Sequence, residues 1–180
     1  MPQLLLVLAL AGSFDQGVSD AIRRDTGIKS LNYVMQGFSL LSDARYEAAL
    51  QLGVFYFSNA EANRNARLAA TAWGASGVTA VLLKGLVNRD RPDHSQTSRW
   101  NSSFPSGHTI SWFSLATVYG LKYPKLIAPL AVIGAGVAYS RVYFGKHYPT
   151  DVLAGAALGI GLGWLTVKLE PQLRKIPFLR

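Results

Sequence analysis

The chain has 180 residues, enough for one domain with a hydrophobic core but too few for two comfortable ones. Charged residues make up 16%, against roughly 25% in an average soluble domain, and the absence of cysteine excludes disulfides and thiolate zinc sites. The net charge of +8 is typical of proteins that meet nucleic acid, anionic lipid or phosphorylated substrates. Because the basic residues fall between apolar segments, and not in a stripe with aromatic platforms, nucleic acid is disfavoured.

The N-terminal third predicts two helices after a short apolar run. Residues 4–11 are apolar but too few to span a bilayer, which takes about 20 residues, so residues 1–12 are either a signal peptide or a truncated first transmembrane helix. Apolar residues recur at helical spacing over 28–41, which predicts an amphipathic helix that lies on a membrane surface or covers a core. Asp43 is placed to cap a helix that runs to about residue 58, and residues 59–65 read as a polar turn.

Four apolar segments rich in small residues follow, at 66–83, 107–121, 126–143 and 152–167. Gly155, Gly159 and Gly163 repeat at the spacing that lets membrane helices approach closely. We therefore expect residues 1–180 to form a single all-α domain. It would be a compact bundle of five to six helices, embedded in a membrane, with the active site at one end; the alternative is a compact soluble bundle.

If these four segments alternate in direction, Lys84 and the connections at 91–108 and 141–151 meet at one end of the bundle. The other end receives most of the remaining basic residues: Arg64, Arg67, Lys122, Lys125, Lys168, Arg174, Lys175 and Arg180. Because cytoplasmic loops of membrane proteins are enriched in Lys and Arg, this pattern predicts that the site faces away from the cytoplasm.

The first candidate group is Lys84 with Arg91 and Pro92. Lys84 alone would be an ordinary cation at a helix C-terminus, and Pro92 ends any helical continuation. Arg89 and Arg91 lie in the connection and are interpreted locally as solvated charges. Arg89 keeps that interpretation, whereas Arg91 gains a possible role from the two groups that follow.

The second group, Pro105, Ser106, Gly107 and His108, precedes an apolar helical segment. Ser106 is placed as an N-cap, and Gly107 allows a ligand to approach the backbone closely. A helix N-terminus with free N–H groups favours anions. His108 is either a proton donor to such an anion or an incidental first-turn residue.

The third group contains Ser140, Arg141, His147 and Asp151. Pro149 indicates a helix start, so Asp151 falls in its first turn, four residues after His147. The carboxylate is then close enough to hold one ring nitrogen and leave the other as a nucleophile. The alternatives are an ordinary loop histidine and a surface ion pair between Arg141 and Asp151.

Charge links the three groups. Lys84, Arg91 and Arg141 would repel one another beside a single carboxylate unless an anion lay between them. Arginine suits phosphate because it donates paired N–H bonds, and stabilising the phosphoryl oxygens is the main demand of phosphoryl transfer.

The pattern K-x6-RP, PSGH and SR-x5-H-x3-D resembles the type 2 phosphatidate phosphatase (lipid phosphate phosphatase) superfamily, which shares its site with bacterial acid phosphatases and vanadium haloperoxidases. All eleven signature positions are present. The resemblance implies that His147 forms a phosphohistidine, that Asp151 orients it, and that His108 protonates the leaving oxygen. It also implies phosphate binding by Lys84, Arg91, Ser106, Gly107 and Arg141, with no metal and no cofactor.

The resemblance further implies a phosphorylated lipid substrate at the outer leaflet of a bacterial inner membrane, such as phosphatidate, phosphatidylglycerol phosphate or undecaprenyl diphosphate. The first rival hypothesis is a soluble periplasmic acid phosphatase that acts on small phosphomonoesters. A vanadium haloperoxidase and a non-catalytic membrane scaffold with a relic site are further alternatives. The sequence does not determine which phosphate ester is cleaved or the oligomeric state.

Overall fold

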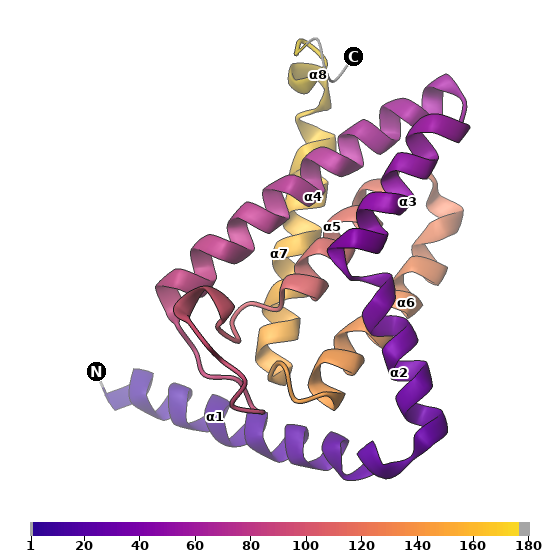
Figure 1. Ribbon diagram of the computed structural model, residues 1–180. Coiled ribbons are helices and arrows are strands. Elements are labelled where there is room, and N and C mark those ends of the chain that lie inside the picture. The colour runs from indigo at the N-terminus through magenta and orange to yellow at the C-terminus, as the bar shows by residue number, and fades with distance from the viewer. Residues whose placement is uncertain (1, 177–180) are drawn as a thin grey trace.

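The computed structural model describes residues 2–176, and this part of the chain is helical without strands (Figure 1). Residues 2–176 form eight α-helices and three short 3-10 helices. The α-helices are α1 (Pro2–Arg23), α2 (Lys29–Leu41), α3 (Ala44–Phe57), α4 (Ala60–Val87), α5 (Gly107–Lys122), α6 (Ile127–Tyr143), α7 (Pro149–Lys168) and α8 (Glu170–Leu173). The prediction of an all-α bundle is confirmed, and α1 and α8 are additional to the six helices expected.

The prediction of a polar turn at 59–65 is wrong, because α4 already begins at Ala60. The side chain of Asn59 accepts a hydrogen bond from the Ala62 N–H at 2.9 Å and so caps the helix. Glu61 lies in the first turn, where an acidic side chain is favourable. A polar stretch of this kind suits a cap and first turns as well as it suits a loop.

The apolar run at 4–11 is the first part of a longer helix, since α1 extends to Arg23. In Figure 1, α1 crosses the lower end of the bundle, where α7 begins. Asp15 and Ser19 are its buried polar side chains there. The interpretation of residues 1–12 as a signal peptide or truncated span stays a prediction.

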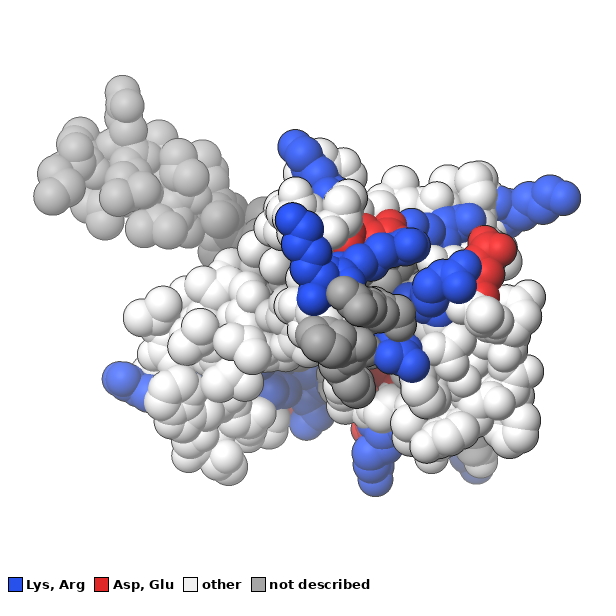
Figure 2. Space-filling view, turned by 90° about the horizontal axis from the view of Figure 1, so that it is seen from above, with Lys and Arg blue, Asp and Glu red and all other residues white. Residues whose placement is uncertain are grey.

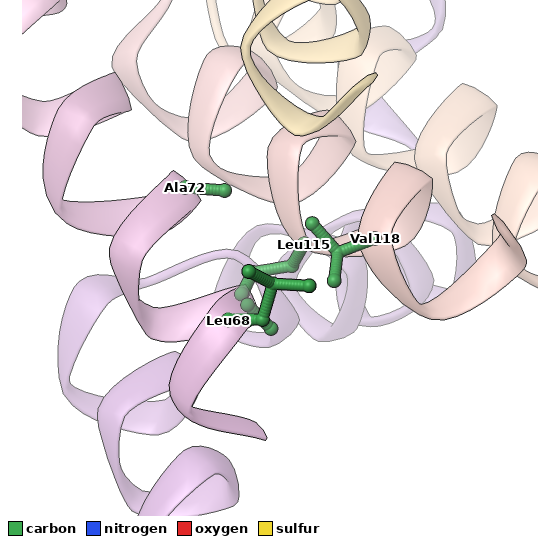
Figure 3. Close-up of a cluster of buried hydrophobic side chains, with 5 residues drawn as sticks. Leu68, Ala72, Leu115 and Val118 are labelled. Carbon is green, nitrogen blue, oxygen red and sulfur yellow. The ribbon is translucent and has the colours of Figure 1, made fainter. Parts of the chain in front are cut away.

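Helix α5 lies at the centre of the bundle and packs against α4, α6 and α7. Leu68 and Ala72 of α4 meet Leu115 and Val118 of α5 in a buried apolar cluster (Figure 3). This cluster fixes α4, which ends with the first candidate group, against α5, which begins with the second.

The glycines of α7 allow its backbone to approach that of α5 very closely. A Cβ atom added at Gly155 would lie 3.0 Å from the Ser106 carbonyl oxygen, and one at Gly159 would lie 2.5 Å from the Ile110 carbonyl oxygen. At Gly159 a Cβ would clash with the backbone at this separation of the two helices, and at Gly155 it would fit only if the backbones moved apart slightly.

Three helical segments are long and apolar enough to cross a membrane, namely Ala60–Val87, Pro124–Tyr143 and Pro149–Lys168. Large apolar side chains such as Leu82, Val132 and Leu153 are exposed on them. Exposed apolar surface of this extent is suited to lipid and not to water. It agrees with the predicted membrane-embedded bundle.

The amphipathic helix α2 covers the end of α6. Its Asn32 side chain accepts a hydrogen bond from the Tyr143 hydroxyl at 2.8 Å, and its Ser39 hydroxyl accepts one from Arg141 at 2.5 Å. Of the two predicted roles for 28–41, the structure therefore shows the covering one.

The end opposite the candidate site is basic, as predicted (Figure 2). The predicted residues of this end that the structure describes are Arg64, Arg67, Lys122, Lys125, Lys168, Arg174 and Lys175. Lys122 and Arg174 share Glu170 as an ion-pair partner, at 2.5 Å each. Arg180 lies outside the described residues.

Candidate active site

The three candidate groups meet at one end of the bundle because short helix-terminal segments bind one another. The Ser103 N–H donates to the Arg89 carbonyl at 2.8 Å, and the Ser106 N–H donates to the Asp151 carbonyl at 3.1 Å. The segment before α5 is thus hydrogen-bonded both to the chain after α4 and to the first turn of α7. This connection brings Lys84 together with the second and third groups.

Local capping places the functional side chains. Asn88 takes a left-handed conformation (φ 48°) and ends α4 just after Lys84. Ser106 caps α5 by accepting a hydrogen bond from the Thr109 N–H at 3.4 Å. Asp151 lies in the first turn of α7 and accepts a hydrogen bond from the Tyr148 N–H at 2.8 Å. The predicted N-cap and the predicted helix start are both confirmed.

His147 is buried with its ring in one defined tautomer. Its Nδ1 lies 2.6 Å from the Ser103 carbonyl oxygen, and because a carbonyl only accepts, Nδ1 must carry the proton. Burial, followed by the charges of Lys84, Arg141 and Arg91, holds the pKa of His147 well below its usual 6.5. The ring is therefore neutral, with its proton on Nδ1 and with Nε2 unprotonated.

Asp151 does not hold His147 directly as predicted, since the carboxylate is 4.0 Å from Nδ1, beyond hydrogen-bond range. Its oxygens instead accept from the Tyr148 N–H, the Ser103 hydroxyl and Arg89. Ser103 therefore joins the two residues, with its carbonyl on His147 and its hydroxyl on Asp151. The Asp151 carboxylate does not bond to the imidazole because its oxygens already accept hydrogen bonds at the start of α7 and from Arg89.

Three cations, Lys84, Arg91 and Arg141, lie around His147. No acidic side chain that the structure describes forms an ion pair with any of them. Lys84 donates to the Ser102 carbonyl, and Arg91 donates to the Asn101 carbonyl at 2.9 Å and to its side-chain oxygen at 2.7 Å. These acceptors are neutral, so they fix the cations without cancelling their charge.

Arg141 likewise has no acidic partner among the described residues, and it also has an N–H donor without an acceptor. It is buried and donates to the Ser39 hydroxyl, while its Nε–H is buried with no hydrogen-bond partner among the described residues. The alternative of a surface ion pair between Arg141 and Asp151 is wrong. A buried guanidinium with an unsatisfied donor is suited to an anionic ligand.

The start of α5 is open on one side. A Cβ at Gly107 would meet nothing within 4 Å, so space for a ligand exists beside this backbone. Ser106 is fully buried, and its hydroxyl accepts from the Thr109 hydroxyl at 2.9 Å. His108 is half-buried, and burial, followed by the positive charge of Arg141, lowers the pKa of its ring to about 4.

Arg89 is not a solvated loop charge, contrary to the sequence interpretation. It binds Asp151 and Asp15 at 2.6 Å each and stacks over the Tyr148 ring at 4.1 Å. Burial opposes its charge, but the hydrogen bond to Asp15 and the charge of Asp151 outweigh burial and hold the pKa of Arg89 above its usual value. No residue near Arg89 in the sequence indicates these contacts, since Asp15 lies 74 positions away.

A comparison with known families matches the PAP2 superfamily profile to residues 65–175, which contain every candidate residue above. The chain belongs to the PAP2 superfamily. It is accordingly a phosphatase, as the resemblance predicted. Within the part of the chain that the structure describes, no group of three or more His, Asp or Glu side chains is placed to hold a metal ion.

Curated relatives and solved structures of this superfamily are similar over most of the chain. A lipid A 1-phosphatase of Rhizobium etli is 28% identical, with 86% of this chain and 75% of the relative covered. A phosphatidylglycerophosphatase B of Bacillus subtilis is 28% identical, with 96% of this chain and 93% of the relative covered. The crystal structure of a transmembrane PAP2-type phosphatidylglycerolphosphate phosphatase from Bacillus subtilis is 25% identical, with a TM-score of 0.72 and 96% of both chains covered.

The transmembrane neighbour and the three apolar helices identify the chain as an integral membrane protein. The rival hypothesis of a soluble phosphatase is therefore wrong. The prediction of a membrane-embedded bundle is confirmed.

Proposed function

We propose that this protein hydrolyses a lipid phosphate or diphosphate through a phosphohistidine intermediate, without a metal ion. Residues 1–180 act as one domain, and the site faces the periplasm or cell exterior. The observation that carries the proposal is the arrangement around His147. A neutral, buried imidazole lies among three cations that form no ion pair with any acidic side chain of the described residues.

In the proposed reaction, Lys84, Arg91 and Arg141 bind the phosphoryl oxygens together with the Ser106 hydroxyl and the Gly107 N–H. The cations offset the charge on these oxygens as it develops in the transition state. Because they are already fixed by neutral acceptors, little reorganisation is needed when the substrate arrives.

Nε2 of His147 then attacks phosphorus, and the bond between phosphorus and the leaving oxygen breaks. His108, in its protonated form, gives its proton to that oxygen. In the second step His108 removes a proton from water, the resulting hydroxide attacks phosphorus, and the P–N bond breaks to release phosphate and regenerate neutral His147. Ser103 and Asp151 hold the ring in the attacking orientation throughout.

The preference for a lipid rests on a side-open apolar groove of about 600 Å³ between α4 and α7. It begins at Leu83 and Phe104, which are chain neighbours of the phosphate-binding groups, and extends along α7 to Leu165. A hydrocarbon chain in this groove would have its phosphorylated end at His147. Lipid substrates in the names of the relatives agree with this arrangement.

Phosphate release in detergent tests the activity, with a panel of lipid monophosphates, isoprenyl diphosphates and water-soluble esters. We expect lipid esters to be hydrolysed with the highest kcat/KM. His147→Ala should abolish turnover while the protein still unfolds at the parent temperature and still binds vanadate. Retained turnover in His147→Ala would refute the mechanism, and a preference for soluble esters would refute the substrate class.

The orientation rests on the Lys and Arg side chains that gather at the end opposite the site (Figure 2), because cytoplasmic loops are enriched in these residues. Because the chain has no cysteine, single cysteines can report each end. Ser98→Cys lies exposed at the site end, and Ser58→Cys lies exposed between α3 and α4 at the other. A membrane-impermeant maleimide should label Ser98→Cys in intact cells and Ser58→Cys only after lysis; the reverse result would overturn the orientation.

A further inference from the structure

Two buried carboxylates at the site end share one guanidinium. The side chains of Asp15 and Asp151 are 1% and 0% exposed, and Arg89 bonds to both, through Nη2 and Nη1 respectively, at 2.6 Å. A single arginine donates in two directions in this way because its guanidinium is a rigid planar fork. The N-terminal helix α1 is thus bonded, through Arg89, to a residue of the reacting centre.

Asp15 also binds the first turn of α7 directly. Its Oδ1 accepts the Thr150 N–H at 2.9 Å, and its Oδ2 accepts the Thr150 hydroxyl at 2.5 Å. The free N–H groups of a helix N-terminus favour a negative charge, and here the charge comes from another helix. Thr150 is the residue before Asp151, so this contact fixes the backbone from which the Asp151 carboxylate extends.

Arg89 completes the hydrogen-bond network with Asp15 and Thr150, because it also donates to the Thr150 hydroxyl at 2.8 Å. Its guanidinium lies over the aromatic ring of Tyr148. Every polar group in this network is therefore held by at least two others. A network that is fully satisfied in this way holds one geometry, whereas the loss of one member leaves buried charge unpaired.

We propose that Asp15 and Arg89 are positioning residues for the phosphatase reaction. They hold Asp151 in the conformation that supports Ser103 and, through the Ser103 carbonyl, the His147 ring. The proposal rests on the function proposed above and adds α1, which carries none of the superfamily signature residues, to the machinery that orients the nucleophile. Neither residue bonds to Lys84, Arg91 or Arg141 in the described part of the chain. We therefore expect both to affect the rate of attack by His147 and not the affinity for the substrate.

Four variants test this in the full-length protein in detergent: Asp15→Asn, Arg89→Gln, Arg89→Lys and the double variant Asp15→Asn/Arg89→Gln. Asp20→Asn is the matched control, because Asp20 is exposed on the same helix and, among the described residues, its carboxylate accepts a side-chain hydrogen bond from Gln16 alone. The measurements are kcat and KM for phosphate release from the best lipid ester, the inhibition constant of inorganic phosphate, and the unfolding temperature.

We expect kcat to fall at least about tenfold in Arg89→Gln and less in Asp15→Asn, with KM and the phosphate inhibition constant within about twofold of the parent. Arg89→Lys should recover part of the loss, since an ammonium keeps the charge but not both directed bonds. The double variant should be no slower than Arg89→Gln alone, because both changes break one network. Asp20→Asn should match the parent.

Three results would overturn the proposal: parent kcat in folded Arg89→Gln, losses that multiply in the double variant, or a loss confined to KM and phosphate inhibition. If Arg89→Gln does not fold, Asp15→Asn and Arg89→Lys decide the question, and parent kcat in both would overturn it. If the parent itself released no phosphate from any ester, the proposed function would fail instead, which separates the two failures.

Discussion

The close contact between α5 and α7 makes a quantitative prediction at Gly159. Replacing it with alanine places a Cβ 2.5 Å from the Ile110 carbonyl oxygen and 2.9 Å from the Phe113 Cβ, whereas ordinary contact begins at 3.4 Å. The oxygen belongs to the backbone, so it cannot rotate away, and the two helices must separate by about 1 Å locally. Overpacking of this kind costs about 1–3 kcal/mol.

The same shift should reach the chemistry. Ser106 caps α5, which carries His108, and His147 directly precedes α7. Separating the two helices therefore moves His108, the proposed proton donor, away from His147, the proposed nucleophile. Misplacement by about 1 Å can lower a rate by about a hundredfold. We therefore expect Gly159→Ala to lower the unfolding temperature by about 5 °C and kcat by between tenfold and a hundredfold.

Gly77→Ala is the matched control, because Gly77 lies within the apolar helix α4 and an added Cβ there would meet nothing within 4 Å. Alanine is a better helix former than glycine by up to about 1 kcal/mol, so this variant should be as stable as the parent or more stable. Unfolding is followed by circular dichroism in detergent, and activity by phosphate release. If Gly159→Ala matched Gly77→Ala in both measurements, the close contact would not control the site.

Further predictions concern charge, geometry and metal. Because His108 must be protonated to act and burial lowers its pKa to about 4, kcat/KM should rise as pH falls through 6.5. It should decline only at lower pH, where His147 itself becomes protonated, since the pKa of His147 is held well below 6.5. Lys84→Met removes one cause of that lowered pKa, so the acidic limb of its pH–rate profile should move to higher pH. Arg141→Lys should raise KM and the phosphate inhibition constant about tenfold, because lysine lacks paired donors; unchanged steady-state constants would contradict this. Ser103→Ala removes the hydroxyl between the carboxylate and the segment that holds the imidazole, so kcat should fall about tenfold at constant KM. Treatment with EDTA should leave phosphate release unchanged, and restoration of a lost rate by an added divalent ion would show that a metal takes part.

Local signals predicted much of the site. Ser106 as an N-cap and Asp151 in a first turn follow from residues beside them in the chain, since Gly, Pro and Ser have strong positional preferences at helix starts. The alternation of apolar segments then places Lys84 at the same end as these two. Each of these inferences needs only short stretches of sequence.

Contacts that depend on backbone atoms or distant partners could not be predicted in this way. The acceptor for the His147 ring is the carbonyl of Ser103, and every residue has a carbonyl, so no side chain indicates it. Arg89 resembles any charged loop residue until Asp15 is brought beside it by the fold. The 59–65 stretch was misread because its polar residues are compatible with either a turn or the exposed start of α4.

The bond between Asp15 and Thr150 also bears on how the protein matures in the membrane. These residues lie 135 positions apart, so α1 is synthesised long before α7 emerges to meet it. Contacts of such long range form late in folding, since the intervening chain must first be ordered. A chain that has inserted its first helices but not α7 has no assembled site, and phosphatase activity therefore reports that insertion is complete.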